Sequence, residues 1–282
     1  MKIRIALSAL SFLALAPARA APELDPGHIL GDLCATPDPA AFPSTHVYRL
    51  ANGGTIVFVA VAHVGDAKSP ARKAEILKSI SDAFDRYKPD MVLIEGASSR
   101  KSADSQYIAF LADTARRAFS TGNIEENLFS VKLASDRGVT FSGWDIAPHE
   151  EYIDDIADGF DVPDAIGAHL LRARQNPFAT PSSSVIQREV SAVPTVRRPD
   201  HFDFTGWYRK TYSDTFDPRA GTPCGTGIAS RIVKDESIRR TLNLMTLLDS
   251  YAQPGKVVMV EAGGGHWLAL QHHLTSISKP GR

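Results

Sequence analysis

The stretch KVVMVEAGGGHWLALQHHL, residues 256–274, decides the fold that the sequence predicts. An unbroken apolar run of β-formers leads into Gly263, Gly264 and Gly265, and His266 opens a helical pattern directly after them. A strand that is covered on both faces reads as such a continuous apolar run rather than as an alternation. Glycines at its end permit a close approach of the backbone to another group. We therefore expect a buried strand whose end carries a functional turn.

Similar runs recur along the chain and set the fold class. They are THVYRL (45–50), TIVFVAVA (55–62), DMVLIEG (90–96) and VTFSGWD (139–145). ANGGT between the first two is a hairpin signal, so these two strands should pair antiparallel. Helical stripes occupy 69–87, 103–119, 125–136 and 235–251, with Ser69 as a cap and Pro70 at the first helical position. This alternation predicts an α/β fold with a mixed, mostly parallel sheet flanked by helices.

Residues from about 160 to 225 depart from that alternation. The segments NPFATPSSS and VPTVRRPD precede the aromatic cluster HFDFTGWYRKTY, which contains His201, Trp207 and Tyr208. We interpret the region as an irregular or helical insertion packed over the sheet, which could serve as a lid. The aromatic cluster is expected either to line that lid or to form a satellite core. Residues 21–282 are thus expected to form one α/β domain with this insertion, a length that can bury a large core.

The first twenty residues predict export. Lys2 and Arg4 precede an apolar run over 5–15 and an Ala-x-Ala site at 18–20, which is the pattern of a secretory signal peptide. The run is too short to span a bilayer comfortably, with an uncleaved anchor as the alternative, and no later segment is apolar for long enough. We therefore expect a periplasmic or secreted protein without stable membrane insertion. In an oxidising compartment Cys34 and Cys224 most simply form one disulfide bond; the alternative, a reactive thiol, would need a neighbouring base.

The charge balance and the motifs narrow the partners. The chain has 31 basic and 32 acidic residues without a basic stripe, so a nucleic acid is not an expected partner. No G-x-S-x-G motif occurs, and the serines at 182–184 lack the setting of a nucleophile, which disfavours a serine hydrolase. The expected ligand is a small-molecule or peptide substrate.

Four of the apolar runs lead to a side chain that can act as an acid, a base or a metal ligand: His63, Glu95, Asp145 and His266. In open α/β sheets, ligands bind outside the carboxyl ends of the strands, so these four side chains form a candidate catalytic site. His63, Glu95 and His266 could hold a divalent metal ion with an open coordination position. The same groups without metal could act as a histidine base and a glutamate that orients it. Amides of the glycine turn could then face an oxyanion.

The remaining histidines carry weaker signals. His149 follows the strand that ends in Asp145 and could edge the pocket. We interpret His272 and His273, on the helix behind His266, as structural. We interpret His28, His46 and His169 as surface residues.

Four stretches of the chain together resemble one superfamily. AVAHVG (60–65), VLIEG (92–96), EENLFSVKLASDRGVTFSGWDIAP (125–148) and KDESIRRTLNLMTLLDSYAQPGKVVMVEAGGGHWLAL (234–270) are similar, in this order, to the TraB/GumN, Tiki peptidase, erythromycin esterase and ChaN-like superfamily. Its members share a pair of G-x-x-H motifs and a glutamate after the second core strand. By this resemblance His63 and His266 take the histidine positions and Glu95 takes the acidic one, while Glu126 and Asp145 resemble further acidic positions. Residues 160–225 lie outside the resemblance.

Two positions depart from the family pattern, and the function stays open between three classes. Ala60 stands where the first motif has glycine, and Lys234 stands where an arginine is expected, which weakens a bidentate carboxylate clamp there. The resemblance implies an exported hydrolase that cleaves a peptide or ester bond, with a divalent metal ion on His63, Glu95 and His266. The alternatives are a haem- or iron-binding protein of the ChaN-like type, or a partner-binding protein that keeps the fold without the chemistry.

Overall fold

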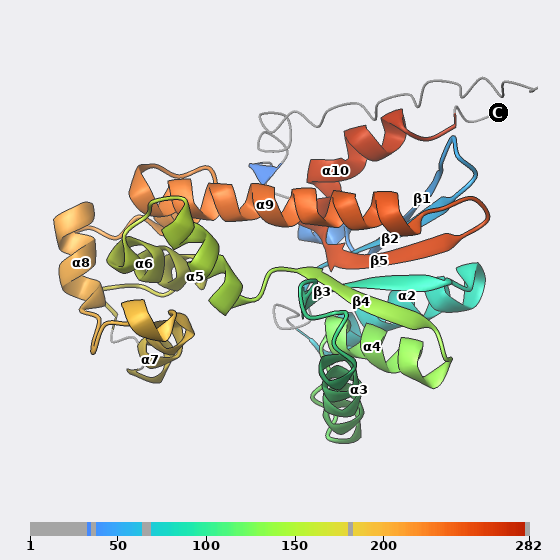
Figure 1. The fold of residues 1–282 in the computed structure, drawn as a ribbon, viewed down its shortest axis with the longest axis horizontal. Coiled ribbons are helices and arrows are strands. Elements are labelled where there is room, and N and C mark those ends of the chain that lie inside the picture. The colour runs from blue at the N-terminus through green and yellow to red at the C-terminus, as the bar shows by residue number, and fades with distance from the viewer. Residues whose placement is uncertain (1–32, 35–37, 64–68, 180–182, 280–282) are drawn as a thin grey trace, which may run out of the picture.

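The computed structural model describes residues 33–34, 38–63, 69–179 and 183–279 (Figure 1). The predicted signal peptide and His28 lie outside these residues. Within them, one sheet contains β1 (Ser44–Arg49), β2 (Thr55–Val61), β3 (Met91–Ser98), β4 (Thr140–Asp145) and β5 (Val257–Gly263) in the order β1-β2-β5-β3-β4. Only the β1–β2 hairpin is antiparallel among these pairs, and the other three pairs are parallel. The predicted mixed, mostly parallel α/β sheet is confirmed.

Helices cover both faces of the sheet, which explains why its inner strands are continuously apolar. On one face lie α2 (Pro70–Tyr87) and α4 (Glu126–Asp136), with α3 (Ser105–Ser120) packed on α4; on the other lie α9 (Gly227–Tyr251) and α10 (Gly264–Ser276) (Figure 1). Each face has its own apolar core. Helix α2 begins as predicted, because Ser69 accepts a hydrogen bond from the Arg72 amide and Pro70 occupies the first turn.

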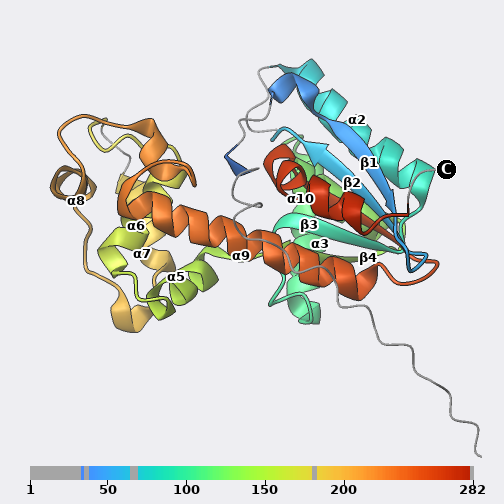
Figure 2. The same cartoon turned by 90° about the horizontal axis from the view of Figure 1, so that it is seen from above.

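A helical lobe lies beyond the carboxyl ends of the parallel strands. It contains α5 (Pro148–Ala157), α6 (Val162–Arg172), α7 (Ser183–Ala192) and α8 (Phe204–Thr211), with short 3₁₀ turns at Thr195–Arg197 and Pro218–Gly221. A further 3₁₀ turn, Pro39–Ala41, precedes β1. The long helix α9 joins the lobe to the sheet (Figure 2). Its first half buries Ala229, Ile232 and Val233 in the lobe, and its second half buries Leu244, Met245 and Leu248 against the sheet.

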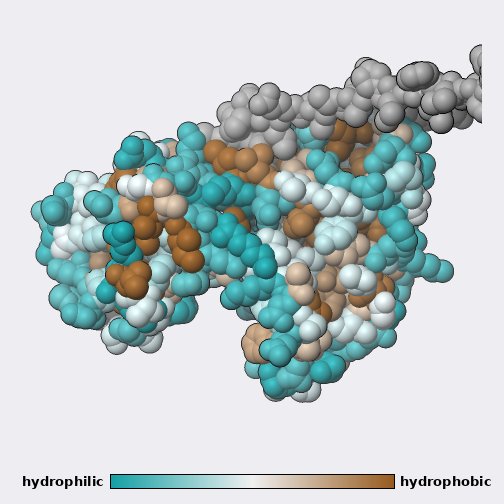
Figure 3. Space-filling view, in the orientation of Figure 1, coloured by the Kyte–Doolittle hydropathy of each residue, from teal (hydrophilic) through white to brown (hydrophobic). Residues whose placement is uncertain are grey.

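The predicted insertion therefore has a core of its own instead of packing over the sheet. Trp207 and Tyr208 belong to that core, which selects the satellite-core interpretation of the aromatic cluster. Gly167 allows the close packing, because a Cβ there would lie 2.2 Å from the Trp207 ring. The surface is indented between the lobe and the part of the molecule that carries α3 (Figure 3).

The predicted disulfide is present. Cys34 and Cys224 are bonded across a sequence separation of 190 residues, with a Cα–Cα distance of 5.5 Å. The bond ties the segment before β1 to the loop that leads into α9. In the described residues, no helix is both long and apolar enough to cross a membrane.

Candidate functional site at the carboxyl edge of the sheet

The structure brings the three residues of the predicted triad to one edge of the sheet. Glu95 lies near the end of β3, His266 lies in the first turn of α10, and His63 lies two residues after β2. His266 Nε2 is 3.5 Å from Glu95 Oε1. A Cβ placed on Gly263 would lie 3.2 Å from His63 Nε2 and 3.5 Å from Glu95 Oε2, so His63 and Glu95 both border the space above this glycine.

Asp145 joins the site through an arginine that the sequence reading missed. Arg240 on α9 makes two hydrogen bonds to Asp145, at 2.5 and 2.8 Å, and a third to Glu95 Oε1 at 3.1 Å. Asp145 also accepts hydrogen bonds from the amides of Gly96 and Ile146. The bidentate clamp that Lys234 put in doubt is therefore formed by Arg240, six residues later. A sequence signal existed: Arg240 lies one helical turn before Leu244, in line with the apolar stripe of α9.

Glu95 is held as a carboxylate. Its Oε2 accepts a hydrogen bond from the Gly263 amide at 2.6 Å. Burial opposes ionisation, but His266, Arg240 and His63 together hold the pKa of Glu95 well below its usual value. The negative charge fixes the turn between β5 and α10, because it binds the backbone on one oxygen and the guanidinium on the other.

His63 is oriented by a buried carboxylate. Glu126, the first residue of α4, lies 2.6 Å from His63 Nδ1. The Glu126 side chain is only 8% exposed, whereas that of His63 is 53% exposed. With Glu126 as the acceptor, Nδ1 donates and Nε2 is the basic nitrogen, on the side of Gly263. The pair thus presents an aligned imidazole at a solvent-accessible edge.

The glycine turn places a helix start beside this imidazole. Gly263 caps α10 without a side-chain hydrogen bond, and the first amides of a helix have no acceptor within it. A Cβ on Gly264 would lie 2.4 Å from the Phe42 ring, whereas the space above Gly265 is open. The helix start therefore offers amides that have no acceptor inside the helix, together with a partial positive charge.

A second buried acid, Glu261, lies close to the site and was also missed. It occupies β5 two residues before Gly263, so both side-chain positions point to the same face of the sheet. Glu261 is fully buried, and neither carboxyl oxygen has a hydrogen-bond partner among the described residues. Burial, reinforced by the charges of Glu95 and Glu126, raises its pKa well above the usual value. The sequence signal was a single glutamate inside VVMVEAG.

The three predicted metal ligands do not all bring a ligand atom within 4.8 Å of one another. Across the residues that the structure describes, only Glu151, His169 and Glu236 bring three ligand atoms within 4.8 Å of one another. At the sheet edge, Arg240 supplies the positive charge beside Glu95, and the Gly263 amide occupies Glu95 Oε2. The chemistry proposed for this edge uses the side chains alone, and a metal ion on His63, Glu95 and His266 stays a prediction.

Three further histidines have partners of their own, and one of these three was misread. His149 is exposed and its Nδ1 is 2.9 Å from the Ala192 carbonyl oxygen. His46 stacks on Trp267. His169 was predicted to be a surface residue but is 2% exposed in the helical lobe. Its neighbours within α6 are apolar and buried. Its carboxylate partners come from three other helices, α5, α7 and α9.

Comparison of the chain with protein-family models, curated proteins and solved structures finds no match in any of the three. The functional proposal therefore depends on the geometry of the sheet edge.

Proposed function

We propose that the chain is an exported hydrolase that cleaves an ester or peptide bond at the carboxyl edge of the sheet. The observation that carries the proposal is the His63–Glu126 pair, with His63 Nε2 directed to the space above Gly263. A histidine oriented by a buried carboxylate is a suitable general base at neutral pH. The secreted or periplasmic location belongs to the proposal and agrees with the Cys34–Cys224 disulfide.

The reaction begins when His63 Nε2 takes a proton from a water molecule, and the water oxygen attacks the carbonyl carbon of the substrate. Glu126 stabilises the imidazolium that forms, because its carboxylate accepts from Nδ1. The tetrahedral intermediate collapses as the bond to the leaving oxygen or nitrogen breaks. His63 then returns the proton to that atom, which yields a carboxylic acid and an alcohol or amine.

The helix start of α10 is placed to stabilise the negative oxygen of the intermediate. The amides of its first turn have no acceptor in the helix, and such preorganised donors contribute about 3–4 kcal/mol to a transition state of this type. Gly265 leaves the approach to these amides open. Glu95, Arg240 and Asp145 act as positioning residues, since they hold the β5–α10 turn in place.

The test is hydrolysis of p-nitrophenyl esters and of a fluorogenic peptide library by the full chain. His63→Gln should lower kcat by about 100-fold or more, since a general base contributes at least that factor. Glu126→Gln should lower kcat less and shift the pH profile of kcat/KM. His149→Gln, an exposed histidine outside the site, is the matched control and should keep the wild-type rate.

Two results would overturn the proposal: no turnover of either substrate class, or a His63→Gln variant with the wild-type rate. Treatment with EDTA separates this mechanism from the metal-dependent one, because activity through His63 and Glu126 should survive chelation. A Soret band on titration with haem, in a protein without turnover, would favour the haem-binding class instead.

A further inference from the structure

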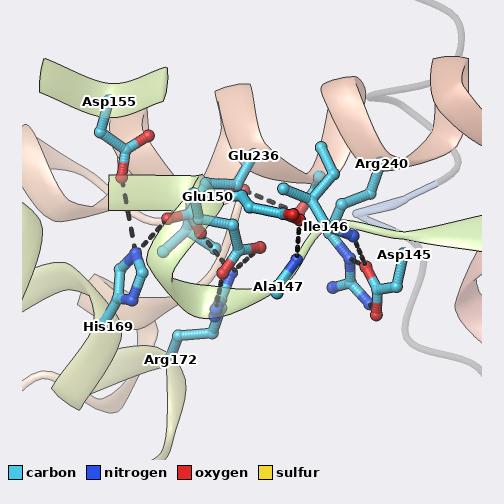
Figure 4. Close-up of polar contacts among 12 residues, drawn as sticks. Asp145, Ile146, Ala147, Glu150, Asp155, His169, Arg172, Glu236 and Arg240 are labelled. Atoms are coloured by element: carbon cyan, nitrogen blue, oxygen red, sulfur yellow. Dashed lines mark hydrogen bonds and ion pairs between the residues drawn. The ribbon is translucent and has the colours of Figure 1, made fainter. Parts of the chain in front are cut away.

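The helical lobe has at its centre a histidine whose two ring nitrogens both face carboxylates. His169 on α6 is only 2% exposed. Its Nε2 lies 2.6 Å from Glu236 Oε1 on α9 and 3.5 Å from Asp155 Oδ2 on α5 (Figure 4). Its other nitrogen, Nδ1, lies 3.7 Å from Glu189 Oε2 on α7. Three helices thus direct one carboxylate each at a single buried imidazole.

This geometry fits an imidazolium and does not fit a neutral ring. A neutral imidazole has one N–H donor and one lone pair, whereas the imidazolium donates from both nitrogens. In a neutral ring, one nitrogen would direct its lone pair at a carboxylate in a site closed to solvent, and such an unpaired buried acceptor is costly. The Tyr152 ring stacks on His169 at 4.1 Å between ring centroids, and the face of an aromatic ring favours a cation. His169 is therefore the protonated partner of these carboxylates.

The charges around the ring lead to the same result. Four buried carboxylates lie around the ring or beside its partners: Glu151, Asp155, Glu189 and Glu236. Three arginines pair with them: Arg172, Arg188 and Arg239. Arg239 also pairs with Asp158, whose side chain is 53% exposed. Three guanidiniums leave one of the four buried negative charges unbalanced, and the proton on His169 supplies the fourth positive charge.

The arginines occupy the carboxylate oxygens that point away from the ring. Arg172, on α6 itself, binds the second oxygen of Glu236, and Arg239 on α9 binds the second oxygen of Asp155. The oxygens that remain are the ones that face His169. A neutral imidazole would therefore leave these oxygens without a cation.

The other elements that pack on α6 meet it on either side of His169. Trp207 of α8 packs over Gly167, and Gly221, in the 3₁₀ turn before α9, packs against the Leu171 backbone. The charged groups that face the imidazole thus come from α5, α7 and α9, besides the arginine of α6.

We propose that the proton on His169 holds the helical lobe together, and that its loss releases α6 from α5, α7 and α9 while the sheet stays folded. A neutral ring would leave a buried negative charge without a partner, which is among the more destabilising changes inside a protein. The lobe has an apolar core separate from the two cores of the sheet, so it can loosen on its own. This pH-sensitive device is independent of hydrolysis at the sheet edge.

The direction of the effect follows from the pKa of His169. Burial by itself would lower this pKa, but the negative charges of Glu236, Asp155 and Glu189 raise it well above the usual value of 6.5. The stabilisation is therefore complete below pH 6.5 and is lost as pH rises through the folded value. The lobe should be rigid in acidic and neutral surroundings and should loosen in alkaline ones.

The first measurement is the ¹⁵N spectrum of the histidine rings in the full chain between pH 6 and pH 10. At pH 7 both ring nitrogens of His169 should carry protons, and the imidazolium signal should disappear as pH rises toward 10. The His169→Gln variant assigns the signal. If that variant does not fold, contacts between the ring protons of His169 and Tyr152 assign the signal in the wild type.

The second measurement is hydrogen exchange of the α6 amides, corrected for the intrinsic dependence of exchange on pH, with the α2 amides as the internal reference. From pH 7 to pH 9.5, α6 should lose at least about tenfold of its protection relative to α2, because one extra proton in the closed state changes the opening constant by up to about tenfold per pH unit. In His169→Gln, α6 protection should already be low at pH 7 and should not change with pH. His149→Gln, an exposed histidine of the same lobe, is the matched control and should behave as the wild type.

A neutral His169 ring at pH 7 would overturn the proposal, because the proton would then lie on a carboxyl group. A ring that keeps its proton up to pH 10 would overturn the release, as would wild-type α6 amides whose protection does not fall relative to α2. A folded His169→Gln variant with wild-type protection of α6 would have the same consequence. These measurements use no substrate, so their outcome is separate from that of the hydrolysis assays.

Discussion

Replacing Arg240 with methionine tests the electrostatic centre of the sheet edge. The change keeps much of the side-chain volume but removes the charge that pairs with Asp145 and Glu95. All three side chains are less than one fifth exposed, so water cannot replace the lost partner. Removing one member of a buried ion pair costs about 3–5 kcal/mol, because the other charges stay buried and unpaired. The melting temperature should fall by roughly 6–20 °C for a chain of this size.

The loss should depend on pH in a defined direction. In the wild type the pKa of Glu95 is lowered, so its stabilisation is present above the unfolded value of 4.5 and is lost as pH falls toward the folded value. Without Arg240, the pKa of Glu95 should rise, because less positive charge offsets the burial that opposes its ionisation. Protonation of Glu95 in the folded variant then relieves part of the loss. The folded wild type keeps Glu95 ionised and loses stability instead, because the unfolded chain takes up the proton. The difference in unfolding free energy should therefore shrink between pH 7 and pH 4.

Urea denaturation followed by circular dichroism at both pH values measures this difference. Lys234→Met is the control, because Lys234 precedes Arg240 on the same helix and takes part in no ion pair in the described part of the chain. Its unfolding free energy should stay within about 0.5 kcal/mol of the wild type. An Arg240→Met variant within 1 kcal/mol of the wild type at pH 7, or a gap that widens on acidification, would refute the reasoning.

Two further predictions concern buried groups away from Arg240. Glu261→Leu should raise the unfolding free energy at pH 7 by about 1–3 kcal/mol, since neither carboxyl oxygen has a hydrogen-bond partner among the described residues. Because the folded pKa of Glu261 is raised, the gain should shrink as pH falls toward the unfolded value of 4.5. A destabilised variant in urea denaturation would contradict this. The wild type should show no titratable thiol under denaturing, non-reducing conditions, and Cys34→Ser with Cys224→Ser should lose on the order of 3–5 kcal/mol because the bond closes a very long loop. A double variant as stable as the wild type would show that the disulfide contributes little.

The sequence predicted those site residues whose position follows from strand direction. His63, Glu95 and His266 each follow an apolar run, and the carboxyl ends of parallel strands share one edge of a sheet. Their convergence needs no knowledge of side-chain packing. Arg240, by contrast, reaches the site from the middle of a helix, and its role depends on how α9 is rotated against the sheet. The motif pointed to position 234 for the arginine that clamps a carboxylate. The clamp is formed by Arg240 instead, because that residue faces Asp145.

The sequence by itself determined the α/β class, the β1–β2 hairpin, the Ser69 cap of α2 and the pairing of Cys34 with Cys224. These features depend on local periodicity, on turn chemistry and on the small number of cysteines. Only the tertiary structure decided that Glu261 is buried without a hydrogen-bond partner in the described part of the chain, and that His169 lies among carboxylates rather than at the surface. The physical reason is that charge interactions depend on distance and on exclusion of water. Both are set by helices that are remote in sequence: Glu151 and Glu236, which flank His169, are separated by 85 positions of the chain.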